Sequence, residues 1–280
     1  MEVQKGKILN EIDDKTKYKE TYPEMKGKGE FKALHELHVF LMPVNPEQKD
    51  VDLAIEATKK YNEKYAKELG DYTMKMCYLT LLFRKAGPVK VLQSARYLRS
   101  DDTDEVIKEI YKDAEFYQDY GFDIARIKIE ANAWSIKGVP ESDEDAKKFP
   151  KYFEHHIKVE HKTCKENKPL PKDEEDALTE VSQKMCKLYK APVPLSWNNL
   201  ANPDNHENPG YQRFLNIRFR NQGMKSIQSA VENIRKSINE QTNFKVVKSI
   251  DEYVWYDTYT SMDWGWIDFS PEDEKELISS

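Results

Sequence analysis

Glycine is scarce in this chain, with ten among 280 residues, and none of the glycine-dependent nucleotide-binding motifs occurs. The sequence contains no P-loop and no G-x-G-x-x-G turn, which argues against a P-loop NTPase and against a dinucleotide-binding domain. The motifs G-x-S-x-G and H-E-x-x-H are also absent. The chain therefore lacks the usual sequence signatures of α/β-hydrolases and zinc metalloproteases.

Cysteine is scarcer still, and the three cysteines, Cys77, Cys164 and Cys186, form no C-x-x-C pair. Cys77 lies in an apolar run and Cys186 on the apolar side of a predicted helix, so we expect buried free thiols. Free thiols favour a reducing compartment, and we expect a cytoplasmic protein. Residues 1–30 lack the apolar segment of a secretory signal, and the apolar run 77–83 is too short to span a membrane.

The net charge of −6 provides no general excess of cations. Binding to duplex nucleic acid needs clustered lysine and arginine, so general duplex binding is not expected. The hydrophobic fraction of 39% is sufficient for a globular core, and the length allows one large or two medium domains. The sequence leaves the oligomeric state open.

Hydrophobic periodicity predicts the same order of elements, β-α-β-β-α-β, in each half of the chain. In the first half the predicted ranges are 33–42, 51–69, 74–83, 89–98, 103–120 and 123–134. In the second half they are 152–161, 173–189, 193–197, 211–220, 224–241 and 244–256. This order is that of the ferredoxin-like fold. We therefore expect an α+β protein of two tandem ferredoxin-like lobes from an internal duplication, with antiparallel sheets and helices on one face.

The predicted organisation has five parts. Residues 1–30 form a polar leader, 31–137 the first lobe, 138–150 a linker, 151–258 the second lobe, and 259–280 a tail that is first aromatic and then acidic. The tail contains Trp264 and Trp266, which could either seal the two lobes or stack on bases or sugars.

The candidate chemistry lies on the first strand of each predicted lobe, where Glu36 and His38 are matched by Glu154 and His156. In a strand, side chains alternate between the two faces. Each histidine therefore shares a polar face with the glutamate two residues before it, whereas His155 points to the apolar face. We expect one functional histidine in each lobe.

The third predicted strands add cations, because the first and third strands of a ferredoxin-like sheet are neighbours. Guanidinium groups bind phosphate and carboxylate oxygens in a forked geometry. The predicted catalytic pair is His38 and His156, acting as acid and base, with Glu36 and Glu154 in support. The predicted ligand-binding residues are Arg96, Arg99, Lys158, Asn216, Arg218 and Arg220. This set predicts binding, hydrolysis or transfer on a phosphorylated small molecule, a nucleotide or an RNA end, in a cleft between the lobes.

A two-lobed layout with one histidine per lobe is similar to that of the two-histidine (2H) phosphoesterases. The resemblance implies a phosphoesterase-like enzyme. The signature of that family is His-x-Thr or His-x-Ser in each lobe. This chain has His38-Val39-Phe40 and His156-Ile157-Lys158, so the hydroxyl residue is missing from both.

Two other interpretations stay open. Alternating charge on one sheet face is also typical of a solvated surface, which would suit a noncatalytic protein-interaction module. Alternatively, Glu36, His38, Glu154 and His156 could share a divalent metal ion between the lobes. The main interpretation requires no cofactor.

Overall fold

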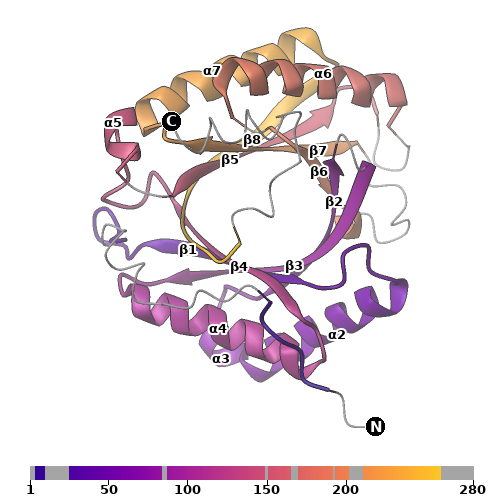
Figure 1. The fold of residues 1–280 in the computed structure, drawn as a ribbon, viewed down its shortest axis with the longest axis vertical. Coiled ribbons are helices and arrows are strands. Elements are labelled where there is room, and N and C mark those ends of the chain that lie inside the picture. The colour runs from indigo at the N-terminus through magenta and orange to yellow at the C-terminus, as the bar shows by residue number, and fades with distance from the viewer. Residues whose placement is uncertain are drawn as a thin grey trace. The chain divides into compact units, whose positions relative to one another are not determined.

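A computed structural model describes residues 4–9, 25–83, 87–148, 151–164, 170–191, 193–201 and 211–259 (Figure 1). Beyond Tyr259, the predicted aromatic and acidic tail lies outside these residues. In the described ranges, no helix is long and apolar enough to cross a membrane.

Helices and strands alternate along both halves of the chain. The first half contains β1 (Leu34–Leu41), α2 (Gln48–Lys64), α3 (Ala66–Leu69), β2 (Lys75–Phe83), β3 (Gly87–Arg99), α4 (Thr103–Asp119) and β4 (Ile124–Asn132). The second half contains α5 (Asp143–Ala146), β5 (Tyr152–His161), α6 (Lys172–Tyr189), β6 (Leu195–Asn198), the 3-10 helix η1 (Asn199–Ala201), β7 (Gln212–Arg220), α7 (Met224–Gln241) and β8 (Phe244–Asp257).

The described strands hydrogen-bond in the order β1-β3-β2-β6-β7-β5-β8-β4, and β4 pairs with β1, so the sheet is a single closed barrel. The prediction of two tandem ferredoxin-like lobes, each with its own open sheet, is therefore wrong, and so is the duplicated scaffold based on it. A ferredoxin-like sheet would leave edge strands with unpaired backbone groups. Closing the sheet pairs those groups.

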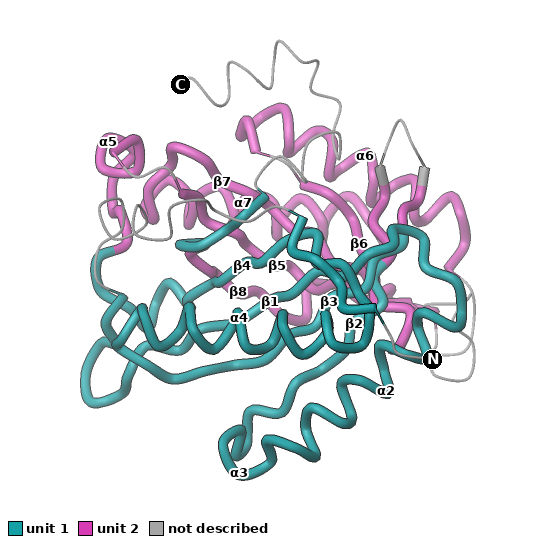
Figure 2. The backbone as a smooth tube through the Cα atoms, turned by 60° about the horizontal axis from the view of Figure 1, so that its bottom comes forward, with its two compact units in different colours: residues 1–79, 90–138, 254–262 teal, residues 80–89, 139–253, 263–280 magenta. Residues whose placement is uncertain are grey.

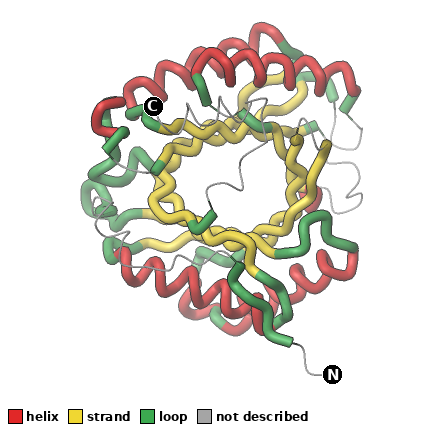
Figure 3. Tube along the Cα trace, viewed as in Figure 1, coloured by secondary structure: helices red, strands yellow, loops and turns green. Residues whose placement is uncertain are grey.

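The chain divides into two compact units (Figure 2). The first comprises residues 1–79, 90–138 and 254–262, and the second comprises residues 80–89, 139–253 and 263–280. The strands β2, β3 and β8 each contribute residues to both units. The boundaries inside β2, β3 and β8 leave no mark in the sequence, because each lies within a continuous strand. In each unit the helices cover one face of the strands (Figure 3).

In the first unit β1 pairs antiparallel with both β3 and β4. Its odd-numbered residues Leu37, Val39 and Leu41 are buried, and α4 packs against β1 and β4. Helix α4 begins after Asp102, whose side chain accepts hydrogen bonds from the backbone N–H groups of Asp104 and Glu105. This N-cap satisfies donors that the first turn leaves unpaired. The apolar stripe of α4 is Val106, Ile110, Ala114 and Tyr117.

In the second unit β5 pairs antiparallel with β7, and β7 pairs with β6. The helices α6 and α7 lie side by side (Figure 1). Each buries an apolar stripe at helical spacing. The buried residues include Leu178, Val181 and Met185 on α6 and Ile227, Ile234 and Ile238 on α7. Strand register therefore fixes which polar side chains of each unit lie next to one another.

Candidate functional site

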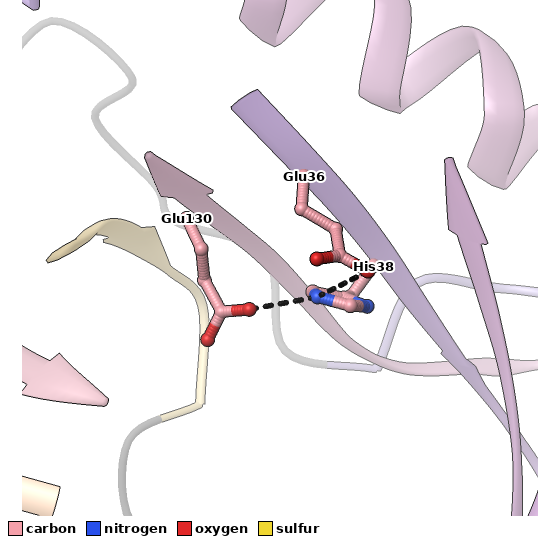
Figure 4. A group of neighbouring side chains, drawn as sticks. All are labelled: Glu36, His38 and Glu130. Atoms are coloured by element: carbon pink, nitrogen blue, oxygen red, sulfur yellow. Dashed lines mark hydrogen bonds and ion pairs between the residues drawn. The ribbon is translucent and has the colours of Figure 1, made fainter. Parts of the chain in front are cut away.

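Strands β1 and β4 bring Glu36, His38 and Glu130 together in the first unit (Figure 4). Glu36 and His38 are two residues apart on β1 and share a face. On β4, Glu130 pairs directly with Glu36, and Lys128 pairs with His38. The register of one antiparallel pair thus places two carboxylates, an imidazole and an ammonium group side by side.

The contacts around His38 are close. Its Nε2 lies 2.8 Å from Glu130 Oε2 and 3.9 Å from Glu36 Oε1. Lys128 Nζ lies 2.6 Å from Glu130 Oε1, the other oxygen of the same carboxylate. One donor atom from each of Glu36, His38 and Glu130 can be chosen so that all three lie within 4.8 Å of one another.

This group is buried. His38 is 5% exposed, Lys128 is 3% exposed and Glu130 is fully buried, whereas the Glu36 side chain retains 18% of its exposure. Burying a charge is costly unless an opposite charge compensates it. With a neutral imidazole, these four side chains carry one net negative charge at neutral pH. Carboxylate and imidazole groups that converge in this way can hold a cation.

Gln93 on β3 orients the imidazole, because its side-chain amide hydrogen-bonds His38 Nδ1. In this arrangement the amide nitrogen faces Nδ1, so the ring proton is assigned to Nε2, pointing at Glu130. A half-turn of the amide would present its oxygen instead. Nδ1 would then carry the proton, and the Nε2 lone pair would be available as a metal ligand.

The second unit carries a related group around His156. Its Nδ1 lies 2.7 Å from Asn216 Oδ1, and its Nε2 lies 3.3 Å from Glu252 Oε2 and 3.8 Å from Glu154 Oε1. Here Glu154 also forms an ion pair with Arg218, at 3.0 Å from NH2 to Oε1. The polar partners of the two predicted histidines are therefore similar in kind, but the charge around His156 includes a guanidinium.

The two arginines predicted to clamp an anion in the first half lie elsewhere. Arg96 pairs with Leu37 across β1 and β3, so it lies on the face opposite His38. Its Nε is 2.7 Å from Asp113 Oδ2, and its NH2 is 3.1 Å from Glu109 Oε2. Arg99 binds the Tyr72 hydroxyl at 2.8 Å and the Lys32 carbonyl at 3.2 Å.

The residues predicted to clamp an anion in the second half also have protein partners. Lys158 Nζ lies over the ring of Phe214 and the Arg220 guanidinium over the ring of Tyr152, at 5.8 and 4.7 Å from the centroids. Asn216 binds both His156 and Ser196. The prediction of a phosphate or nucleotide site is therefore wrong: the cations proposed for it lie against carboxylates, backbone carbonyls and aromatic rings.

Sequence reasoning missed Glu130, Lys128 and Gln93. The signal for the first two was present, because Lys128 and Glu130 alternate with the buried Ile127 and Ile129 along β4. Charged residues at every second position of an otherwise apolar strand indicate a polar face. Gln93 gave no comparable signal, because its approach to His38 depends on the register of β3.

No protein-family model matches this chain, and no curated protein matches it. Similar solved structures include a heme-binding protein from Thermus thermophilus, with 10% identity, 89% of this chain and 96% of that chain covered, and a TM-score of 0.26. An aldoxime dehydratase in complex with butyraldoxime is 9% identical, with 83% of this chain and 85% of that chain covered and a TM-score of 0.36. A mutant chlorite dismutase from Candidatus Nitrospira defluvii in complex with cyanide has 11% identity, coverage of 89% and 96%, and a TM-score of 0.26.

None of these three proteins is named for a phosphorylated ligand. At such identities and TM-scores the likeness assigns no chemistry to this chain. The functional argument therefore depends on the side chains of the described units.

Proposed function

We propose that the first unit binds a divalent transition-metal ion through Glu36, His38 and Glu130. The observation that supports this proposal is the convergence of one imidazole nitrogen and two carboxylate oxygens within 4.8 Å, in a largely buried group. One nitrogen and two oxygen ligands suit zinc, manganese, cobalt and iron(II) better than a soft ion such as copper(I). This ligand set differs from the four-residue set shared between lobes that the sequence suggested.

The separations fit a small adjustment on binding. Ligand atoms bonded at about 2.1 Å to a common ion are roughly 3 to 3.5 Å apart. The distance from His38 Nε2 to Glu130 Oε2 is already 2.8 Å, and that to Glu36 Oε1 is 3.9 Å. Glu36 is more exposed than the other two, so its side chain can move closer. The ion would take the position on Nε2 that faces the two carboxylates.

Lys128 and Gln93 would act as supporting residues. Lys128 holds Glu130 Oε1, which leaves Oε2 to face the ion. The Gln93 amide fixes the imidazole, and with its oxygen turned to Nδ1 it would leave the Nε2 lone pair for the ion. Three protein ligands leave at least one coordination position for water or a small ligand. A divalent ion in such a position acts as a Lewis acid and lowers the pKa of bound water.

The cytoplasm is the compartment that we propose, on the basis of the thiols. Cys77, Cys164 and Cys186 are all free. Burial raises the pKa of Cys77 to about 11 and that of Cys186 to about 12. Thiols with a raised pKa stay protonated at neutral pH and react slowly, which suits a reducing environment.

The proposal is tested by titrating metal-free protein with Co²⁺ and recording the visible absorption bands of the protein-bound ion. We expect one ion per chain, and we expect His38→Gln to abolish the bands. His156→Gln is the matched control, because it removes a histidine that also lies beside two glutamates, and it should retain the bands. Glu36→Gln provides a second variant at a more exposed position, and it should weaken Co²⁺ binding by at least tenfold.

Three outcomes would overturn the proposal. The first is absence of bound cobalt in the folded wild-type protein. The second is loss of the bands in His156→Gln but not in His38→Gln. The third comes from a parallel titration with hemin, a probe chosen because one of the similar structures is described as a heme-binding protein. A Soret shift that requires His38, without cobalt bands, would assign the histidine to an iron porphyrin.

A further inference from the structure

We infer that Ser249, His155 and Asp251 form a nucleophile-base-carboxylate relay on the second unit, separate from the proposed metal site. His155 Nε2 lies 2.7 Å from Ser249 Oγ, and its Nδ1 hydrogen-bonds Asp251 Oδ1. The imidazole thus bridges a hydroxyl and a carboxylate through its two nitrogens. Contacts of this kind define the serine-histidine-aspartate arrangement of acyl-transfer enzymes, whatever the fold.

Strand alternation explains how this chain assembles the group. Ser249 and Asp251 are two residues apart on β8, so both side chains lie on one face of that strand. His155 is on β5 and points to the face opposite His156. Further along the same strands, the rings of Phe153 and Tyr253 pack with centroids 4.9 Å apart, which holds β5 and β8 together. The double histidine of the sequence therefore contributes one residue to each of two polar groups.

Burial favours a directed relay over a solvated cluster. The side chain of His155 is 3% exposed, whereas that of Asp251 is 30% exposed, and Ser249 is partly exposed. The base is shielded from water, and the residue that carries the hydroxyl is partly exposed. The hydrogen bond to Asp251 assigns the ring proton to Nδ1, so the Nε2 lone pair faces Ser249. This is the tautomer that a general base requires.

The chemistry follows from that tautomer. Ser249 Oγ attacks the carbonyl carbon of a carboxylic ester while its proton passes to His155 Nε2. The bond between the carbonyl carbon and the alkoxy oxygen breaks, and the departing alcohol takes the proton from His155. Water then attacks the acyl-serine, again giving a proton to His155, which returns it to Ser249 as the carboxylic acid leaves. Asp251 stabilises the imidazolium in both halves.

The surroundings of Ser249 indicate the substrate class. Val247 lies two residues before Ser249, on the same face of β8, and is 42% exposed. An exposed apolar side chain on the same strand face as the hydroxyl favours an ester with a short apolar acyl group. We therefore assign the site to small activated carboxylic esters.

The inference is tested with a biotinylated fluorophosphonate, which labels activated serines, and with 4-nitrophenyl acetate as substrate. We expect mass spectrometry to find the label on the peptide that contains Ser249. Ser249→Ala should abolish the label, and Asp251→Asn should slow both labelling and ester hydrolysis by about 100-fold or more, because the tautomer is lost. Ser237→Ala, on α7, is the control serine variant and should react like the wild type.

Other results would contradict the inference. Absence of label on the folded wild-type protein, or label that persists in Ser249→Ala, would show that the three residues form a structural hydrogen-bond network only. Equal rates for Asp251→Asn and wild type would exclude the relay even if Ser249 is labelled. A chelator should leave labelling unchanged, because the proposed metal site uses other residues. Failure of either proposal is therefore recognised without reference to the other.

Discussion

His35 provides a sharp test of the packing in the first unit. It is fully buried, and burial lowers the pKa of its imidazole to about 4. Its Nε2 lies 3.0 Å from the Ser100 carbonyl oxygen, and Trp255 Nε1 lies 3.2 Å from its Nδ1. The Trp255 N–H donates to Nδ1, so the proton is on Nε2 and donates to Ser100. A neutral ring satisfies both contacts, and protonation would set two donors against each other at Nδ1.

The pH dependence of stability follows from the difference between the pKa of His35 in the folded protein and in the unfolded chain. Between pH 6.5 and 4 the unfolded chain protonates His35 and the folded protein does not. The contribution of His35 to stability is therefore fully present above pH 6.5 and is lost as the pH falls towards 4. A difference of about 2.5 pKa units corresponds to roughly 3 kcal/mol, at 1.36 kcal/mol per unit.

The assay is urea unfolding of the wild type and His35→Gln at several pH values between 4 and 7.5. Other groups titrate in the same range, but their effects are common to both proteins and cancel in the difference between the two free energies of unfolding. We expect that difference to shrink by about 3 kcal/mol from pH 7 to pH 4. A difference that stays constant across this range would refute the account of a buried neutral imidazole.

Three further predictions concern other parts of the first unit. Arg96→Met removes the partner of the buried Asp113 and should lower the free energy of unfolding by about 3 to 5 kcal/mol in urea titrations. The control Arg99→Met should lower it by less than about 1 kcal/mol. Equal losses in the two variants would contradict the burial of the Arg96–Asp113 ion pair. Asp102→Ala removes the N-cap of α4 and should cost about 1 kcal/mol in the same assay, so that an unchanged midpoint would argue against the cap. Cobalt affinity should weaken as the pH falls, because protons compete with the metal ion for its ligands, and affinity independent of pH would contradict ligation by these side chains.

Much of the local structure could be predicted from the sequence. Alternation placed the first strand at 33–42, and the structure has β1 at Leu34–Leu41. Alternation also separated His155 from His156, and the two histidines have different sets of partners. Each of these predictions depends on residues close together in the chain, for which period and propensity are informative.

The arrangement of the strands could not be predicted in the same way. The pairing partners of a strand depend on long-range hydrogen bonds that leave no mark on its own periodicity, so two open sheets and one closed barrel share the same pattern. The register between paired strands could not be predicted from periodicity either. Arg96 was assigned to the face of His38, but it pairs with Leu37 and lies on the opposite face. Conversely, Glu130 reaches His38 only because β4 pairs with β1.

The most direct measurement is an anomalous difference map, recorded at the zinc absorption edge, from crystals of this protein grown with Zn²⁺. The account predicts a peak about 2.0 to 2.2 Å from His38 Nε2 and from one carboxylate oxygen each of Glu36 and Glu130. Absence of a peak at these three residues, with the His38–Glu130 hydrogen bond retained, would contradict the metal-binding proposal.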